Sequence, residues 1–260
     1  MFCFGMVTWD VSSLVIRAIP GFCQPISSLS HLAAAAVGVV AAFPLVRSAA
    51  GNRGRVAAVG IYVSCVIATL GISGAYHSID RGSPARDLMM HIDHYAIWLL
   101  IAGTFTAVHG IMFQGFWRTG VLTFAWIYAA VGVSLQIYRF DIFGGWVGLL
   151  LYLGLGWFGI VSIVKAGREV GFPAVRLIWL AGLAYSTGAV LEATVHWHII
   201  DHWVGPHELF HIAVIVGVTM HWVFIRRMVR RYAAASRAAM VGASTPAEVL
   251  GLPVAVPKLA

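Results

Sequence analysis

The chain has 260 residues, of which 60% are hydrophobic and only 10% are charged, and its mean hydropathy is +0.86. A soluble domain of this length needs far more charge to cover its surface, so the composition favours an integral membrane protein without a sizeable soluble domain. The formal net charge of +7 does not indicate nucleic-acid binding, because five of the 17 Lys and Arg residues lie between Arg226 and Arg237, directly after the last apolar segment.

Seven apolar segments follow one another along the chain, and each is 19 to 22 residues long, close to the length that crosses a bilayer core. They cover residues 26–46, 56–77, 92–113, 119–138, 146–164, 175–195 and 207–225. Helices are predicted because lipid offers no partners to open backbone groups. The expected fold is an all-α membrane protein with a seven-transmembrane helix bundle over residues 26–231. An N-terminal segment (1–25) precedes it, and a disordered tail (232–260), rich in Ala, Gly, Ser and Pro, follows.

The basic residues predict the orientation of the bundle. Four of them fall on the side of the N-terminus and twelve on the opposite side, if the distant Lys258 is left out. Positive residues stay inside, so the C-terminus is expected in the cytoplasm and the N-terminus outside.

Polar and ionisable residues gather where the second, third, sixth and seventh spans reach the N-terminal side of the bilayer. They are Ser73, His77, His91, Asp93, His94, Glu192, His196, His198, Asp201, His202, His207, Glu208 and His211. Ionisable groups at membrane depth are expensive, so a cluster of them indicates a functional site.

His207 and His211 are four residues apart and therefore project from the same face of a helix, as paired zinc ligands often do. His77 would supply a third nitrogen if the second and seventh spans are neighbours. Three histidines leave the fourth tetrahedral position open, as in catalytic zinc sites. Asp93 could then bind the zinc-held water or orient a ligand histidine. The alternative is a polar knot that joins the helices through hydrogen bonds worth roughly 1 kcal/mol each.

Residues 207–211 also fit the HExxH pattern of metalloproteases, in which Glu208 would be the general base. A zincin domain with a downstream ligand has no room in this chain. Glu208 has a second interpretation, as an interfacial residue favoured by the N-terminus of its helix.

Three segments, LGISGAYHS (70–78), HIDHYAIWLLIAGTFT (91–106) and HELFHIAVIVGVTMHW (207–222), resemble the hemolysin III branch of the progestin and adipoQ receptor family. The resemblance implies that His77, His207 and His211 bind one zinc ion, and that Asp93 and Ser73 engage the zinc-bound water or its surroundings. Family members are similar to alkaline ceramidases, and bacterial members are associated with cytolysis. The first span departs from the family pattern: where an acidic residue often stands, the sequence reads QPISSLSH (24–31), so no role in the site is carried over to this span.

Two functions follow as hypotheses. The first is a zinc-dependent hydrolase of a lipid amide or ester, ceramide-like in class, that works among membrane lipids in the plasma membrane of a bacterium. In it, Asp93 acts as general base or orients water, and Ser73 donates a hydrogen bond near the metal or oxyanion. The second is a non-enzymatic cytolytic or receptor-like protein with structural zinc. A transporter that uses the histidines as a path would need more polar residues on the cytoplasmic side. His31, His109 and His221 are interpreted as packing or hydrogen-bonding residues, and His196, His198 and His202 as part of a solvated loop.

Overall fold

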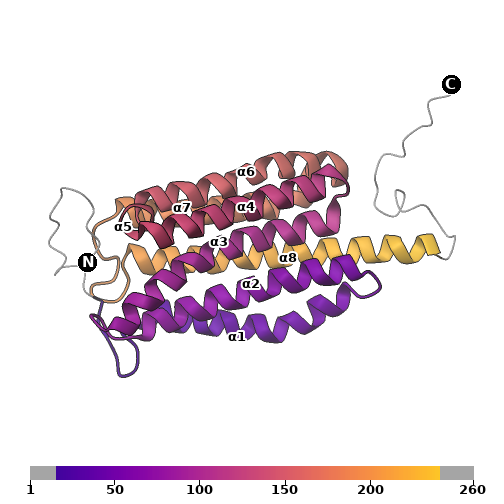
Figure 1. The fold of residues 1–260 in the computed structure, drawn as a ribbon. Coiled ribbons are helices and arrows are strands. Elements are labelled where there is room, and N and C mark those ends of the chain that lie inside the picture. The colour runs from indigo at the N-terminus through magenta and orange to yellow at the C-terminus, as the bar shows by residue number, and fades with distance from the viewer. Residues whose placement is uncertain (1–15, 241–260) are drawn as a thin grey trace.

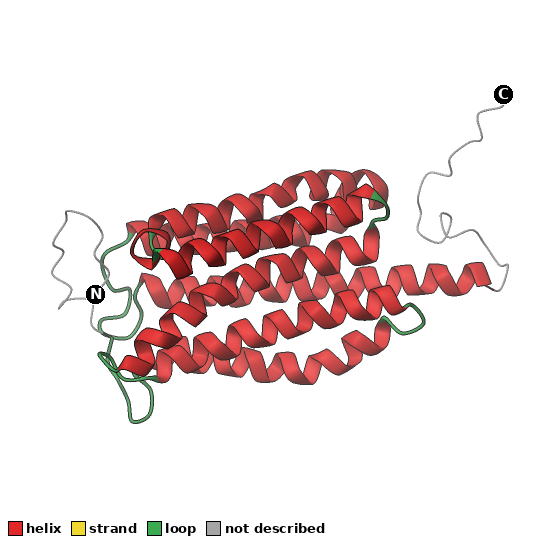
Figure 2. Ribbon diagram, in the orientation of Figure 1, coloured by secondary structure: helices red, strands yellow, loops and turns green. Residues whose placement is uncertain are grey.

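The computed structural model describes residues 16–240, which fold into a bundle of long helices (Figure 1). Seven of these are long and apolar enough to cross a membrane: α1 (Pro25–Ser48), α2 (Arg53–Ser78), α3 (Pro84–Met112), α4 (Phe116–Tyr138), α6 (Trp146–Val170), α7 (Phe172–Thr194) and α8 (Pro206–Met240). A single short helix, α5 (Phe140–Phe143), lies between α4 and α6. Over residues 16–240, strand pairing is limited to two isolated bridges, so helices and loops make up the fold (Figure 2). The predicted all-α bundle with seven spans is confirmed.

Capping residues set where two of the helices begin. The side chain of Asn52 accepts a hydrogen bond from the backbone N–H of Arg55 at 2.9 Å, and Ser83 does the same for Arg86 at 3.3 Å. Pro84 then occupies the first turn of α3, where its missing N–H costs nothing. The cap at Ser83 starts α3 well before its apolar stretch, so the prediction that this helix opens at residue 92 was wrong.

The last helix also extends beyond its apolar segment. The span predicted to end at 225 continues to Met240, so the disordered tail expected from 232 is wrong for residues 232–240. Alanine is the best helix former, and Ala233 and Ala235 are buried against the bundle. Arg55 of α2 donates a hydrogen bond to Ser236 at 3.0 Å, which holds this extension in place. The remaining parts of both predicted terminal segments, 1–15 and 241–260, lie outside the described residues.

Helix neighbours bring the polar cluster together at one end of the bundle. α1 and α3 each pack against both α2 and α8, while α7 packs against α6 and α8. The packing of α1 against α2 needs Gly74, because a Cβ atom there would lie 2.6 Å from the Leu32 side chain. The helix ends that carry the cluster therefore meet on the side where α1, α3 and α8 begin (Figure 1).

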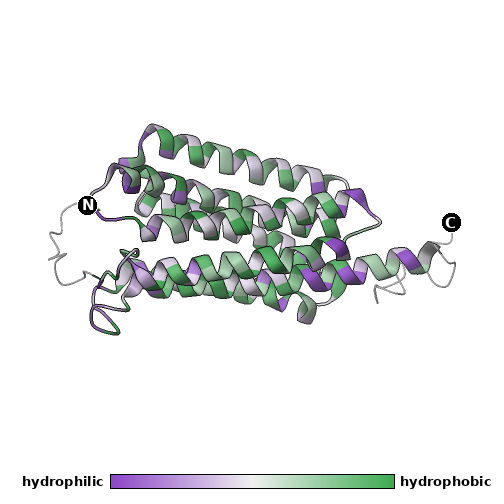
Figure 3. Ribbon diagram, turned by 90° about the horizontal axis from the view of Figure 1, so that it is seen from below, coloured by the Kyte–Doolittle hydropathy of each residue, from purple (hydrophilic) through white to green (hydrophobic). Residues whose placement is uncertain are grey.

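Hydrophobic residues make up most of the length of the helices, whereas hydrophilic residues concentrate at the helix ends and along the extension of α8 (Figure 3). Large apolar side chains such as Val40, Phe43 and Leu150 are at least 64% exposed. In water such an apolar surface would promote aggregation, whereas in a membrane it contacts the lipid chains. The protein is an integral, multi-pass membrane protein.

Candidate metal centre

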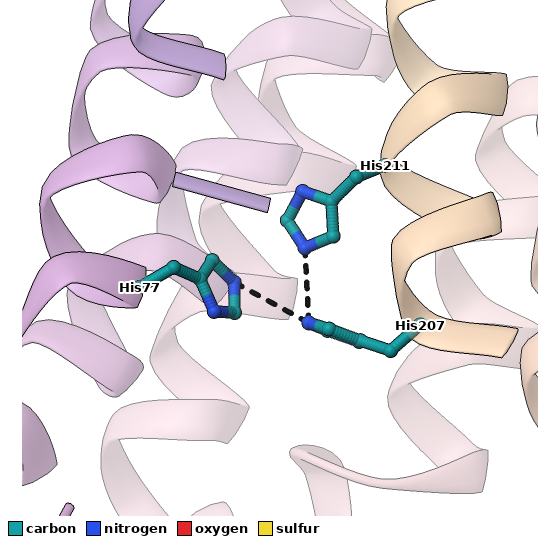
Figure 4. Close-up of side chains that lie close together, drawn as sticks. All are labelled: His77, His207 and His211. Carbon is teal, nitrogen blue, oxygen red and sulfur yellow. Dashed lines mark hydrogen bonds between the residues drawn. The ribbon is translucent and has the colours of Figure 1, made fainter. Parts of the chain in front are cut away.

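Three histidine side chains meet between α2 and α8 (Figure 4). His77 comes from the last turn of α2, and His207 and His211 come from successive turns at the start of α8. The Nε2 atom of His207 lies 2.9 Å from Nε2 of His211 and 3.4 Å from Nε2 of His77. Nitrogens bound to tetrahedral zinc at about 2.0–2.1 Å are about 3.4 Å apart. These three histidines could therefore hold one metal ion.

The second nitrogen of each ring has its own partner, which fixes how the ring is turned. Nδ1 of His77 lies 2.7 Å from Oε1 of Gln24, and Nδ1 of His207 lies 2.7 Å from Oε1 of Glu192. Nδ1 of His211 lies 2.9 Å from Nε2 of His31. An oxygen acceptor requires the proton on Nδ1, so the lone pairs on Nε2 of His77 and His207 point toward each other. Lone pairs that converge in this way repel unless a cation lies between them, and such outer partners are typical of metal-binding histidines.

Burial makes the donor set rigid. His77 and His211 are 2% and 3% exposed, and His31 beside them is 3% exposed. The side chain of His207 is 35% exposed, so the cluster is reached from the side of this residue. Two of the three rings therefore have little access to water. Burial disfavours the charged form of these rings, and the neutral imidazole is the form that binds metal.

Asp93 and Ser73 lie beside the histidines rather than among them. Ser73 precedes His77 by one turn of α2 and is 4% exposed. Asp93 lies on the neighbouring helix α3, close enough to interact with the Ser73 hydroxyl. The sequence had indicated that Asp93 lies where α3 begins. Because α3 begins at Pro84, Asp93 instead lies about 14 Å along the helix. Both residues line the same cavity as the three histidines.

Glu208 is turned away from the histidine cluster. Its carboxylate accepts hydrogen bonds from the backbone N–H of Gly205 at 3.0 Å and from the Ser27 hydroxyl at 3.1 Å, and it is 1% exposed. The bond to Gly205 caps the first turn of α8. The HExxH hypothesis, which needs this carboxylate beside the metal, does not fit this geometry. The interpretation that the N-terminus of the helix favours Glu208 fits the geometry, although the residue is buried rather than interfacial.

The first helix and the residue before it contribute directly to the cluster, which sequence reasoning missed. Gln24, Ser27 and His31 contact His77, Glu208 and His211, respectively. The same reasoning carried no role over to Glu192, which contacts His207. One signal was present: positions 24, 27 and 31 are spaced to lie on one face of a helix, at the start of a segment that is apolar from Leu32 onward. The interpretation of His31 as a hydrogen-bonding residue fits, but its partner is a candidate ligand.

A cavity of about 650 Å³ extends from the cluster into the bundle. Apolar side chains of α3, α6 and α7, such as Ile101, Phe105 and Ile163, line most of its length. At depth it reaches His109, which bonds Ser162 at 2.8 Å, and His221, which bonds Tyr185 at 3.3 Å. These two histidines join neighbouring helices, in keeping with the hydrogen-bonding role expected for them.

Near the mouth, His91 and His94 bond backbone carbonyls of their own helix, those of Asp87 at 2.7 Å and Met90 at 2.8 Å. Their Nδ1 atoms are thereby engaged within α3. The structure thus brings His77, His207 and His211 together with Asp93 and Ser73 around one cavity. Other polar residues on this side of the bilayer line the same cavity, namely His94, Glu192, His196, His198 and Glu208.

Comparisons with known proteins find a matching family and two related proteins. A family model described as "Haemolysin-III related" matches residues 24–222. A "Hemolysin-3 homolog" from Bacillus subtilis (strain 168) is 28% identical over 144 residues, which cover 54% of this chain and 62% of that protein. "Hemolysin-3" from Bacillus cereus is 28% identical over 170 residues, which cover 65% of this chain and 74% of that protein. The match thus spans less than two thirds of the B. subtilis protein.

Proposed function

The chain belongs to the haemolysin-III related family, and on that premise we propose that it is a zinc-dependent membrane hydrolase that cleaves an amide or ester bond of a lipid. The observation that carries the proposal is the convergence of three Nε2 atoms from His77, His207 and His211 at the mouth of an apolar cavity. Three ligands leave a tetrahedral ion one open position, which is the arrangement of catalytic rather than structural zinc sites.

The residues around the cluster would have different roles in the reaction. Gln24, Glu192 and His31 hold the three imidazoles with Nε2 turned inward. Bound zinc would supply Lewis acidity, which lowers the pKa of a water ligand toward 7 and polarises a carbonyl. Asp93 would act as general base for the attacking water, and the nearby Ser73 hydroxyl would orient that carboxylate or donate to the developing oxyanion.

The cavity supports a substrate with a long apolar part. Its volume of about 650 Å³ lies within the usual range for small-molecule sites, and its depth is lined by apolar side chains rather than by charge. A polar group with an amide or ester bond would then lie at the mouth beside the histidines, with its hydrocarbon chain within the bundle. A ceramide-like lipid has this layout.

Purified wild-type protein in detergent tests the proposal by metal analysis and by lipid hydrolysis assays on ceramide and ester lipids. His77→Ala and His211→Ala should lose the zinc bound by the three central histidines, and with it turnover. Asp93→Asn should keep the zinc and lose about 100-fold or more in rate, because general base catalysis contributes that much. Normal lipid turnover by a zinc-free variant would rule the mechanism out.

The alternative is a non-enzymatic cytolytic or receptor-like protein in which the metal is structural. The names of the two Bacillus relatives favour the cytolytic version, and the burial of His77 and His211 is compatible with a structural ion. It predicts that zinc-loaded protein releases dye from liposomes and hydrolyses none of the lipids tested. Asp93→Asn separates the two functions, because it should leave dye release unchanged.

We also propose that the protein lies in a bacterial plasma membrane with its C-terminus in the cytoplasm. The Bacillus relatives support the bacterial setting, and the excess of Arg near the end of α8 supports the orientation. The histidine cluster would then face the outside of the cell.

A further inference from the structure

A second group of possible ligands lies in the loop between α7 and α8, outside the central cluster. It consists of His198, Asp201 and His202, whose ligand atoms all lie within 4.8 Å of one another. We propose that these three residues bind a second divalent ion of the zinc class, in a site that exchanges more readily than the central one. The proposal goes beyond the hydrolase function and does not depend on it.

The distances within this group suit a metal better than an ion pair. Nδ1 of His198 lies 3.6 Å from Oδ1 of Asp201, and Nε2 of His202 lies 3.7 Å from Oδ2 of the same carboxylate. Charge-assisted hydrogen bonds are shorter, at about 2.7–2.9 Å, whereas ligands of a tetrahedral ion are about 3.4 Å apart. One carboxylate thus stands between two imidazoles at nearly the spacing of a coordination shell. Two His and one acidic residue are a donor set that zinc accepts.

The backbone of the loop holds the three side chains together. Ile200 and Val204 form an isolated bridge, and the backbone N–H of Trp203 donates to the carbonyl of Ile200 at 2.9 Å. His202 has a φ of 57°, which lets the turn reverse within a few residues. Its carbonyl accepts a hydrogen bond from the N–H of Arg17 at 2.8 Å, which ties the loop to the segment before α1.

The surroundings explain why the ion should exchange readily. The side chains of Asp201 and His202 are 84% and 56% exposed, so water competes for the ion and fills its remaining positions. Arg17 and Arg81 line the same groove as Asp201 and His202, and their charges oppose a cation. Among residues 16–240, the ion pairs of Asp201 within 4.0 Å are those with the two histidines. The carboxylate is therefore directed at the proposed site rather than at the arginines.

The loop site lies beside the mouth of the central site. A Cβ atom on Gly205 would lie 3.2 Å from the ring of His198 and 3.3 Å from Glu208, so His198 packs against the start of α8. Gly205 precedes His207 by two residues, and His198 lines the same cavity as His207. An ion captured by the loop would thus be held next to the opening through which the central site is reached.

Cobalt(II) titration of the full-length protein in detergent, followed by visible absorption, tests the proposal. Dialysis against Zn²⁺ then gives the number of ions bound per chain. The background is the H77A/H211A double variant, which removes the central site. It should still bind one ion, and adding His202→Ala or Asp201→Asn should weaken that binding more than about tenfold. His196→Ala removes an imidazole of the same loop outside the group and should leave binding unchanged.

Two results would overturn the proposal: the double variant binds no ion, or His196→Ala weakens binding as much as His202→Ala does. If the double variant fails to fold, single variants in the wild-type background decide the question. Wild type should then bind two Zn²⁺ per chain and His202→Ala one, and equal stoichiometry in the two proteins would refute the loop site. Because lipid hydrolysis is not measured, failure of the hydrolase proposal leaves this result unaffected.

Discussion

Gln24→Ala is the sharpest test of how the central histidines are oriented. The Gln24 Oε1 atom lies 2.7 Å from Nδ1 of His77 and accepts a second hydrogen bond from Nη2 of Arg86 at 2.5 Å. His77 is 2% exposed, so water cannot easily replace the lost acceptor. An unpaired buried donor costs about 1–3 kcal/mol. Because this bond holds the lone pair of His77 Nε2 inward, we expect zinc affinity to fall by about 5- to 150-fold.

The matched comparison is Glu192→Ala, which removes the acceptor of His207. The side chains of this pair are 35% and 37% exposed, so water can take the place of the carboxylate. The loss should therefore be smaller, near the tenfold lower end for such outer partners. The assay is competition for Zn²⁺ against a chromophoric chelator, with Gln24→Glu as a control that keeps an acceptor. If Gln24→Ala binds zinc as tightly as wild type while His77→Ala has lost it, the reasoning about ring orientation is refuted.

Three further predictions follow from the geometry. Glu208→Ala should lower stability by about 0.5–2 kcal/mol through loss of the cap on α8, measured by thermal unfolding in detergent, and should leave the zinc content unchanged. Loss of zinc in a folded Glu208 variant would contradict the capping role. Zinc occupancy should fall as the pH is lowered, because protons compete with the ion for Nε2; dialysis at a series of pH values measures this. A reporter fused after Arg237 should be cytoplasmic, and an external signal would reverse the proposed orientation.

The sequence by itself determined the spans and the pair of histidines on one helix. Length and hydropathy are local properties, so seven segments of bilayer length were readable without any contact. The spacing of His207 and His211 needs only the helical repeat, and both do project to one point. The motif order also sufficed to predict the family, which the match over residues 24–222 confirms.

Helix ends were less accessible to that reasoning. Hydropathy marks where lipid begins, whereas a helix begins and ends where its backbone groups find other partners. α3 therefore begins at Pro84, after the Ser83 cap, and α8 continues to Met240, with its extension held by the hydrogen bond from Arg55 to Ser236. Asp93 therefore lies farther from the start of its helix than the sequence predicted.

Only the tertiary structure decided which side chains surround the histidines. His31 meets His211 across 180 positions, and Ser27 meets Glu208 across 181, contacts that no local pattern encodes. They exist because α1 packs against both α2 and α8, and the missing side chain at Gly74 lets α1 and α2 approach closely. The same packing turned Glu208 into a cap rather than a base, and it placed Gln24 on His77, in the segment where the family's usual acid is absent. The sequence of a helix determines which side chains lie on each of its faces, but the packing of neighbouring helices determines which residues those side chains contact.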